Sequence, residues 1–282
     1  MSESEIQHNN GQRNLGPQQS KSDNLSGVLP DPDIVNIILE AKKENPEAQC
    51  TLGILFNQGG GGLPQNFSIA AEWFAKAAKQ GYALAQFNLA NKFLKGEGVP
   101  QDFTMAAALY AKAAEQNFAR AQCNLAFLYD KGRGVPEDPV KAVELYAKSA
   151  EQGFPSAQHN LGIMYEKGRG VPQDFVKAIE WYTKAAEQGV VMSQHKLGLM
   201  YYNGDNGVPQ DFVKAVEWFT KAAEQGDARS QYYLGLMHFK GEGTPINYSQ
   251  ASKWLQESAQ KGYSDAITFL KNHANVFGRL YW

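Results

Sequence analysis

Two short motifs in the chain resemble parts of the active sites of enzymes that cleave β-lactam rings. Ser193 and Lys196 have the spacing Ser-x-x-Lys, in which the lysine amine can help to activate the serine hydroxyl as a nucleophile, and residues 22–24 read Ser-Asp-Asn. The third motif of that set, Lys-Thr-Gly, does not occur in the sequence. We therefore expect both matches to be coincidental, with Ser193 pointing into a packed interior.

A second candidate for chemistry is a row of residues of the types that bind metals. Cys123, His159 and His195 follow one another at intervals of 36 residues, and thiolate and imidazole groups are common zinc ligands. If each residue lies on its own helix, packing separates the helices by about 8–10 Å, whereas a shared zinc needs bonds of about 2.0–2.3 Å. We therefore expect no metal site, and no motif in the chain predicts a cofactor.

Glycine-rich segments of the chain resemble fragments of nucleotide-binding loops. The pair Gly96-x-Gly98 has copies along the chain, and residues 59–62 are four consecutive glycines. A phosphate-binding loop would follow a strand and continue into Gly-Lys-Ser or Gly-Lys-Thr, and neither tripeptide occurs in the sequence. We interpret these glycines as turns between helices.

All of these motifs lie within a sequence that repeats itself. The segment AQHNLGIMYEKGRGVPQDFVKAIEWYTKAAEQG recurs with small changes at a period of 36 residues, and both insertions of one residue fall in the same loop, at 59–62 and 204–207. Self-similarity at a fixed period is typical of stacked supersecondary units. The six units begin at Ala48, Ala85, Ala121, Ala157, Ser193 and Ser230.

Each unit has the pattern of two helices joined by a turn. In the fourth unit three residues share one stripe of a first helix, here named helix A: Ala157, Leu161 and Tyr165. Gly168 is suited to end helix A because glycine readily adopts the left-handed conformation, and Asp174 is suited to cap a second helix, helix B. One hairpin cannot bury its own apolar stripe, so the units must stack.

The predicted fold is all-α, a right-handed α/α superhelix (solenoid) of six helical hairpins covering 48–265. Residues 31–47 contain a helix, expected over Asp31–Glu44, that covers the open face of the first unit. Residues 266–282 begin another helix A and end in an aromatic tail, which we interpret as a cap, with a free segment offered to a partner as the alternative. Residues 1–30 are polar and poor in apolar side chains, so we expect a disordered tail.

The repeated pattern A-x-x-x-L-G-x-x-Y-x-x-G-x-G-V-P-x-D-x-x-K-A-x-x-W-Y-x-K-A-A-E-Q-G resembles the Sel-one-like repeat family, which is related to tetratricopeptide repeats. The resemblance covers roughly four-fifths of the chain. It implies a non-enzymatic α/α-solenoid adaptor that holds other proteins together, in bacterial signalling, host interaction or eukaryotic membrane-protein quality control. Relatives with cysteine-rich repeats have been linked to β-lactam hydrolysis, so a hydrolase stays as an alternative from another class.

The small number of cysteines bears on whether the protein is cytoplasmic, and the net charge bears on whether it binds nucleic acid. Some members of the family outside the cytoplasm carry a cysteine pair in each repeat, whereas this chain has only Cys50 and Cys123, two units apart and beyond the reach of about 7 Å that a disulfide allows. We therefore expect reduced thiols and a cytoplasmic protein. The net charge of −2, without a basic stripe, argues against a nucleic-acid partner.

The sequence also bears on export and on membranes. The first residues lack the basic start and apolar core of a signal peptide, and no apolar segment is long enough to span a bilayer. We expect no membrane insertion. An effector exported without a cleaved signal, or an immunity-type inhibitor of a toxin, remains an alternative.

A protein or an extended peptide is the expected partner, bound along the concave groove that helix A lines in tetratricopeptide-like stacks. Counting the first residue of each unit as slot one, slots one, five and nine face the core and slots three, seven and ten face away from it, at about 100° per residue. Slot seven carries an apolar row, for which burial between neighbouring A helices is the alternative. The candidate partner-binding residues are Asn88, Asn91, Asn124, Asn160, His159, His195, Lys196, Tyr202, Tyr232, Tyr233 and Phe239.

These candidates form two groups along the groove. Asparagine amides both donate and accept hydrogen bonds, so a row of them can pair with the backbone of an extended peptide; the alternative is that they help to start helix A. Toward the C-terminal end, aromatic residues replace the amides, and aromatic side chains often anchor protein interfaces. We expect a groove that is rich in amides in the middle and aromatic at one end.

Overall fold

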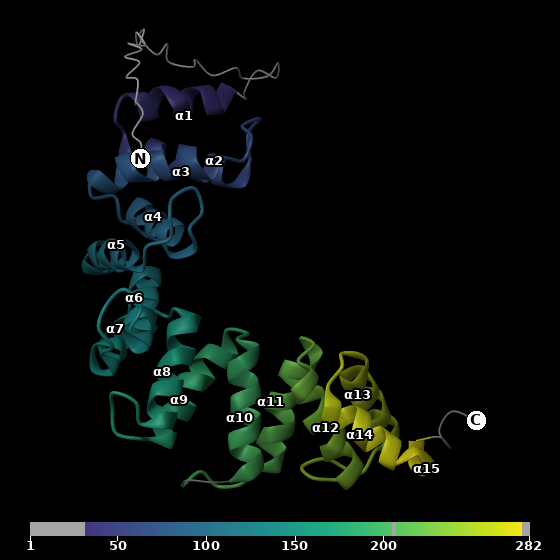
Figure 1. The fold of residues 1–282 in the computed structure, drawn as a ribbon. Helices are drawn as coiled ribbons and strands as arrows, with labels where there is room; N and C mark the ends of the chain where they lie inside the picture. Colours follow the sequence, from purple (N-terminus) through teal and green to yellow (C-terminus); the bar gives the residue numbers. More distant parts are fainter. Residues whose placement is uncertain (1–31, 205–206, 278–282) are drawn as a thin grey trace, which may run out of the picture.

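The computed structural model describes residues 32–204 and 207–277, and these contain fifteen helices and no strand (Figure 1). The expected disordered tail at 1–30 and the last five residues of the aromatic tail lie outside the described residues. The A helices of the six repeats are α2 (Pro46–Gln58), α4 (Ala83–Lys95), α6 (Ala119–Lys131), α8 (Pro155–Lys167), α10 (Val191–Asn203) and α12 (Ala228–Lys240). The B helices are α3 (Phe67–Lys79), α5 (Phe103–Glu115), α7 (Pro139–Glu151), α9 (Phe175–Glu187), α11 (Phe212–Glu224) and α13 (Tyr248–Gln260).

Three further helices lie at the two ends of the stack. At the N-terminal end, α1 (Pro32–Lys42) packs on α2 through Ile34 and Ala41, which share a cluster with Leu52. At the C-terminal end, α14 (Ser264–Asn272) packs on α13, where Ala266 is fully buried, and α15 (Ala274–Phe277) follows it. The first and last hairpins are therefore both covered by additional helix.

The starts of the B helices and the ends of the A helices carry the residues that the sequence predicts. The Asp174 side chain accepts a hydrogen bond from the Lys177 backbone N–H, and an Asp or Asn does the same at the start of every other B helix. Each A helix ends at a glycine in the left-handed conformation, such as Gly168 at φ 62°.

In four of the repeats, the second glycine of the turn lies against the backbone at the start of the preceding B helix: Gly98, Gly134, Gly170 and Gly243. At Gly170, with φ 72°, an added Cβ would lie 2.3 Å from the carbonyl oxygen of Pro139, at the start of the preceding B helix. No non-glycine side chain fits such a contact with the backbone. The Gly-x-Gly turn thus sets the spacing between neighbouring repeats.

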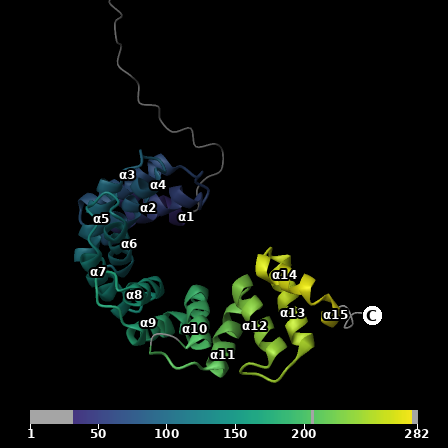
Figure 2. The same ribbon diagram turned by 60° about the horizontal axis from the view of Figure 1, so that its bottom comes forward.

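The hairpins stack into an arc with the A helices on its inner side and the B helices on its outer side (Figure 2). Each A helix packs against the B helix of its own repeat and against the preceding B helix. Large side chains on the B helices fill the centre of each repeat, and Tyr110, Tyr182 and Phe219 are fully buried there. The core is therefore long and thin, as in a solenoid, and each repeat contacts mainly its sequence neighbours.

A buried glutamine at slot two joins successive repeats in a way that the sequence did not reveal. The Gln158 side chain donates to the Ala150 carbonyl at the end of α7 and accepts from the Gln188 amide at the end of α9. Gln86, Gln122 and Gln194 make the same two bonds in their repeats. These glutamines, here called the glutamine clasps, give a second hydrogen bond to carbonyl groups at the helix ends, which also accept one from the backbone of the following turn.

Candidate interaction surface

The inner side of the arc exposes a different stripe of helix A from the one predicted. Side chains at slots zero, four, seven and eleven face solvent or are half-buried, except for Leu236 at slot seven, which is buried; slot zero is the residue before slot one. Slot three is mostly interior, and slot ten is partly so, because B helices flank each A helix on both sides. The exposed stripe of helix A is therefore rotated about the helix axis from the expected face, by less than the roughly 100° that separates one residue from the next.

His159 and His195, expected in the groove, are buried with 7 % and 5 % of their surface exposed. The His159 Nδ1 lies 2.7 Å from the Ser193 hydroxyl of the next repeat, and the His195 Nδ1 lies 2.8 Å from the Ser230 hydroxyl. Burial lowers the pKa of both imidazoles, that of His195 to about 4. The expectation that they line the groove is wrong, because they join repeats in the interior.

A serine, a histidine and an aspartate meet at the joint between the fifth and sixth repeats. The Ser230 hydroxyl donates to Asp227 at 2.8 Å, and the same Asp227 carboxylate lies 3.4 Å from the His195 Nδ1. In a hydrolase triad the two partners contact opposite nitrogens of the ring and the serine is open to substrate. Here both partners contact Nδ1 and Ser230 is fully buried, so the cluster does not match that geometry.

The Ser-x-x-Lys match has a structural explanation as well. Ser193 is fully buried, as expected, and its hydroxyl contacts His159. The Lys196 ammonium is 2.8 Å from the Glu166 carboxylate of the preceding repeat. The lysine is thus paired away from the serine, in an ion pair that crosses between α8 and α10.

The amide row is engaged with groups inside the protein. The Asn124 amide donates to the Tyr110 hydroxyl at 3.1 Å, and that hydroxyl donates to Asn91. Asn88 faces the Cys50 thiol at 3.9 Å, and Asn160 is hydrogen-bonded to the Cys123 thiol. The amides are half-buried, and they join each A helix to side chains of neighbouring helices instead of presenting an unoccupied ladder.

The aromatic candidates come together at the C-terminal end of the inner side. Ring centroids of Tyr202 and Tyr233 are 5.7 Å apart, those of Tyr233 and Tyr232 are 5.5 Å apart, and Tyr232 continues to Tyr263 at 5.3 Å. Phe239 is in contact with Phe269 of α14 at 5.2 Å. All of these rings keep part of their surface exposed. The four linked tyrosine rings form one surface, here called the aromatic patch, that comprises Tyr202, Tyr232, Tyr233 and Tyr263.

Apolar side chains at slot seven continue from the aromatic patch toward the middle of the arc. Phe127 is 39 % exposed, and Ile163 and Leu199 are half-buried, whereas Leu236 is buried. Slot zero adds Met192, which is 55 % exposed and which sequence reasoning missed. The spacing of slots zero, four, seven and eleven along one helix face was the signal that pointed to it.

Neither a metal centre nor a membrane segment is found in the described ranges. Across residues 32–204 and 207–277, no three Cys, His, Asp or Glu side chains gather closely enough to hold a metal ion. None of the helices in that part of the chain combines the length and the apolar character needed to cross a bilayer.

Comparison with known proteins supplies a family. A family model described as the Sel1 repeat matches six consecutive units, each beginning two residues before the unit start that we assigned from the sequence: 46–82, 83–118, 119–154, 155–190, 191–227 and 228–263. A comparison with curated proteins gives no match.

Solved structures of the same architecture resemble the chain. One is a protective antigen of uropathogenic Escherichia coli displaying an SLR fold, with a TM-score of 0.81 and 37 % identity over 84 % of this chain and 50 % of that one. Another is a Sel1 repeat protein from Oxalobacter formigenes, with a TM-score of 0.74 and 34 % identity over 84 % of this chain and 68 % of that one. The chain thus spans half the length of the E. coli antigen structure.

Proposed function

The chain belongs to the Sel1 repeat family, and we propose that it is a non-enzymatic scaffold that binds a segment of another protein along the inner side of its arc. The observation that supports this most strongly is the aromatic patch, in which four linked and partly exposed tyrosine rings lie on α10 and α12 and just before α14. Large rings give much contact area at little cost in side-chain entropy, and exposed apolar area that runs on over several elements is typical of interaction sites.

The proposed contact runs from the aromatic patch along slot seven. Phe127, Ile163 and Leu199 lie on successive A helices, so a partner segment that follows the arc meets one of them per repeat. The amides contribute less than the sequence indicated, since Asn91 and Asn124 hold Tyr110. Specificity in this proposal comes from the aromatic end, and slot seven extends the contact.

The proposed setting is a reducing compartment such as the cytoplasm. In its support, Cys50 and Cys123 are unpaired and buried, and burial raises the pKa of these thiols to about 11 and about 12, so they stay protonated and unreactive. Cells are quenched in acid, the protein is denatured, and its free thiols are alkylated and counted. Both thiols should be found reduced. Oxidised thiols in that assay would favour export.

Capture of partners by the full chain, followed by mass spectrometry and by titration with the partner so identified, tests the proposal. Replacing Tyr232 by Ala and Phe127 by Ala should weaken the affinity by about tenfold or more each, as is usual for central aromatic contacts. The matched control is Val176→Ala on α9, which is 61 % exposed and lies on a B helix. Equal affinities of the wild type and both inner-side variants would refute the proposed site, and turnover of nitrocefin by the purified chain would refute the non-enzymatic assignment.

A further inference from the structure

One position on the B helices divides the repeats into two kinds. It holds a tryptophan in the first, fourth, fifth and sixth repeats and a leucine in the second and third: Trp73, Leu109, Leu145, Trp181, Trp218 and Trp254. The indole of Trp181 packs against a buried cluster shared by the third and fourth repeats, and the indole of Trp218 packs against one shared by the fourth and fifth. In these repeats the tryptophan therefore fills the space between its own hairpin and the one before.

A lysine three residues later lies over three of these four indoles, those of Trp73, Trp181 and Trp218, which are half-buried. The Lys184 ammonium lies 4.0 Å from the centre of the Trp181 ring, and Lys221 lies 4.1 Å from that of Trp218. Lys76 covers Trp73 at 3.9 Å in the first repeat. An ammonium group over an aromatic face is attracted by the negative charge on that face, so ring and lysine form one unit.

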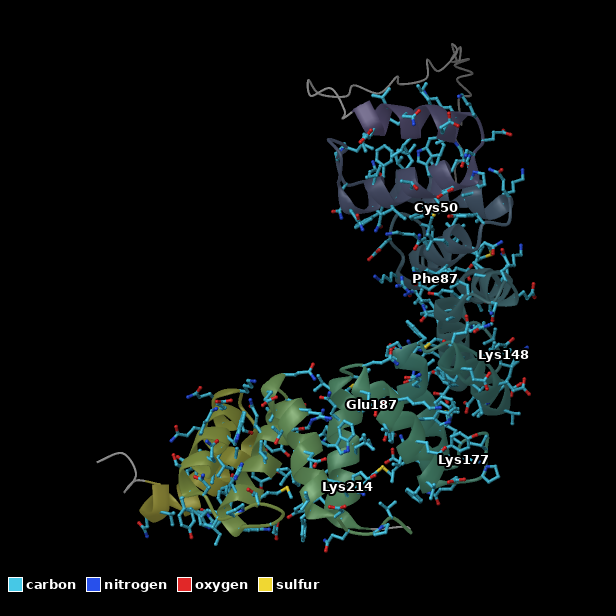
Figure 3. All side chains as sticks on the ribbon, turned by 180° about the vertical axis from the view of Figure 1, so that it is seen from behind. Cys50, Phe87, Lys148, Lys177, Glu187 and Lys214 are labelled. Atoms are coloured by element: carbon cyan, nitrogen blue, oxygen red, sulfur yellow. The ribbon has the colours of Figure 1, made fainter. Side chains whose placement is uncertain are left out.

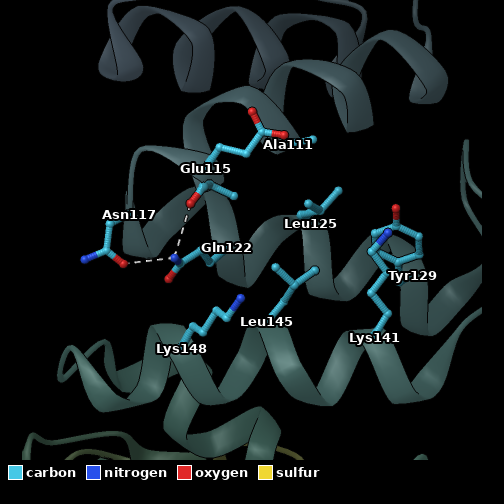
Figure 4. Close-up of a pocket in the computed structure, with 10 residues that line it drawn as sticks. Ala111, Glu115, Asn117, Gln122, Leu125, Tyr129, Lys141, Leu145 and Lys148 are labelled. Atoms are coloured by element: carbon cyan, nitrogen blue, oxygen red, sulfur yellow. Dashed lines mark hydrogen bonds between the residues drawn. The ribbon is translucent and has the colours of Figure 1, made fainter.

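In the third repeat the corresponding space is a pocket. Its volume is about 490 Å³, and Leu145 stands on its floor where the other repeats have the indole (Figure 4). The wall comes from α5, α6 and α7 and is made of Ala111, Ala114, Glu115, Asn117, Gln122, Leu125, Tyr129, Lys141 and Lys148.

The wall of this pocket repeats the surroundings of Trp181 almost residue for residue. One repeat later in the sequence, the equivalent positions carry Ala147, Ala150, Glu151, Gln158, Leu161, Tyr165, Lys177 and Lys184, all of unchanged residue type. Lys141 lies over the Tyr129 ring at 4.4 Å, as Lys177 lies over Tyr165 at 5.4 Å. The chain thus contains the same site twice, once with its indole and once without.

Lys148 is the equivalent of Lys184 in the third repeat, and because Leu145 replaces the tryptophan there, its ammonium group has no indole to cover. Its side chain reaches from α7 into the pocket, beside Leu145 and toward Gln122 (Figure 4). Among the described residues, no carboxylate or ring contact is found for its ammonium group, unlike Lys184 on Trp181. Lys148 lies on the outer side of the arc, away from the aromatic patch (Figure 3).

We propose that this pocket binds the indole ring of a tryptophan side chain presented by a partner protein, with Lys148 over the ring face. An indole is the expected occupant because three other repeats hold their own indole under the equivalent lysine. The inference rests on protein binding as the function of the chain and adds a second contact, on the outer side. Leu109 of the second repeat is not part of it, since that residue is buried in the core.

The test uses N-acetyl-tryptophanamide as the probe, so that it does not depend on any partner of the inner side. Titration of the full chain, followed by the methyl NMR signals of Leu125 and Leu145, should give saturable shifts with a stoichiometry of one. N-acetyl-alaninamide should give none. Leu145→Trp should remove the binding and raise the melting temperature, because its own indole fills the pocket; the control Val140→Trp adds an indole at an exposed site of the same helix and should leave binding unchanged.

A second variant keeps the test decisive if Leu145→Trp does not fold. Trp181→Leu should create the same pocket one repeat later and raise the stoichiometry from one to two. The absence of saturable shifts in the wild type, or equal binding by the wild type and a folded Leu145→Trp variant, would overturn the inference. These outcomes do not involve Tyr232 or Phe127, so they are distinguishable from failure of the inner-side proposal.

Discussion

Lowering the pH below 6.5 should destabilise the arc at His195. His195 is 5 % exposed, and burial, opposed by the Asp227 carboxylate, lowers its pKa from the ordinary 6.5 to about 4. Arg229 and Lys196 add to the lowering. The native protein therefore keeps this imidazole neutral at pH values where the unfolded chain protonates it.

The size and sign of the effect follow from this difference in pKa. The unfolded chain binds more protons than the native state between pH 6.5 and about pH 4, so stability is complete above that window and falls as the pH decreases through it. For one such histidine the loss relative to about pH 8 is about 2 kcal/mol at about pH 5 and about 3 kcal/mol below about pH 4. His159, whose pKa is also lowered by burial, adds to the loss. Asp227, whose pKa is lowered below its ordinary 3.8, contributes only at still lower pH.

The control for this prediction comes from the chain's own repeats. Cys123 occupies the same slot in the third repeat with a protonated, buried thiol, so His195→Cys removes the titrating group with a side chain that this slot accepts. Urea denaturation followed by circular dichroism, at about pH 8 and about pH 5, should give the wild type a loss larger by about 2 kcal/mol than the variant. Equal losses in both proteins would show that His195 is not held neutral by burial, and the reasoning would fail.

Three further predictions concern close packing within and between repeats. Gly170→Ala should cost about 2–4 kcal/mol in thermal or urea denaturation, because its Cβ would meet the Pro139 carbonyl oxygen at 2.3 Å; Gly189→Ala, also at positive φ but with nothing within 4 Å, should cost only about 1 kcal/mol. Gly162→Ala should cost about 1–3 kcal/mol despite its better helix propensity, since the buried Tyr182 ring would lie 2.7 Å from the new Cβ, and a neutral or stabilising result would contradict this. Gln158→Leu should cost about 1–3 kcal/mol in the same assay, because the Ala150 carbonyl and the Gln188 amide both lose a partner.

The sequence predicted the all-helical solenoid because its period, its caps and its turns act locally. Asp174 and Gly168 define helix ends through bonds within a few residues, and such signals can be read without a structure. The family match and the structure agree with that architecture. The helix starts differ from the assigned unit starts by two residues, because slot one is the first core-facing residue of helix A and not its first residue.

The candidate surface was less predictable because it depends on contacts between repeats. The side of helix A that faces solvent is set by how two B helices flank it, and a small error in that angle moves slot three from the surface to the interior. His159 therefore proved to be a partner of Ser193 across a repeat boundary. The aromatic residues stayed near the surface, because a bulky ring at the margin of the core keeps one edge exposed.

The tryptophan and leucine repeats show a further limit of reading one unit at a time. The two repeats with leucine also carry alanine at slot six, Ala90 and Ala126, where the others have glycine. In the fourth repeat that glycine accommodates the Tyr182 ring. Both differences are visible in the sequence, but the side chain that each glycine accommodates is visible only in three dimensions.

The pairing of each histidine with a serine one repeat later gives the chain an order among its units. Removing the fifth repeat would bring His159 to Ser230 and restore the pair, whereas removing the fourth would set Cys123 against Ser193 and leave that hydroxyl without an imidazole. Shortening or lengthening of such a gene by whole units is therefore tolerated at some junctions and penalised at others. The modules are alike in shape but not interchangeable in sequence.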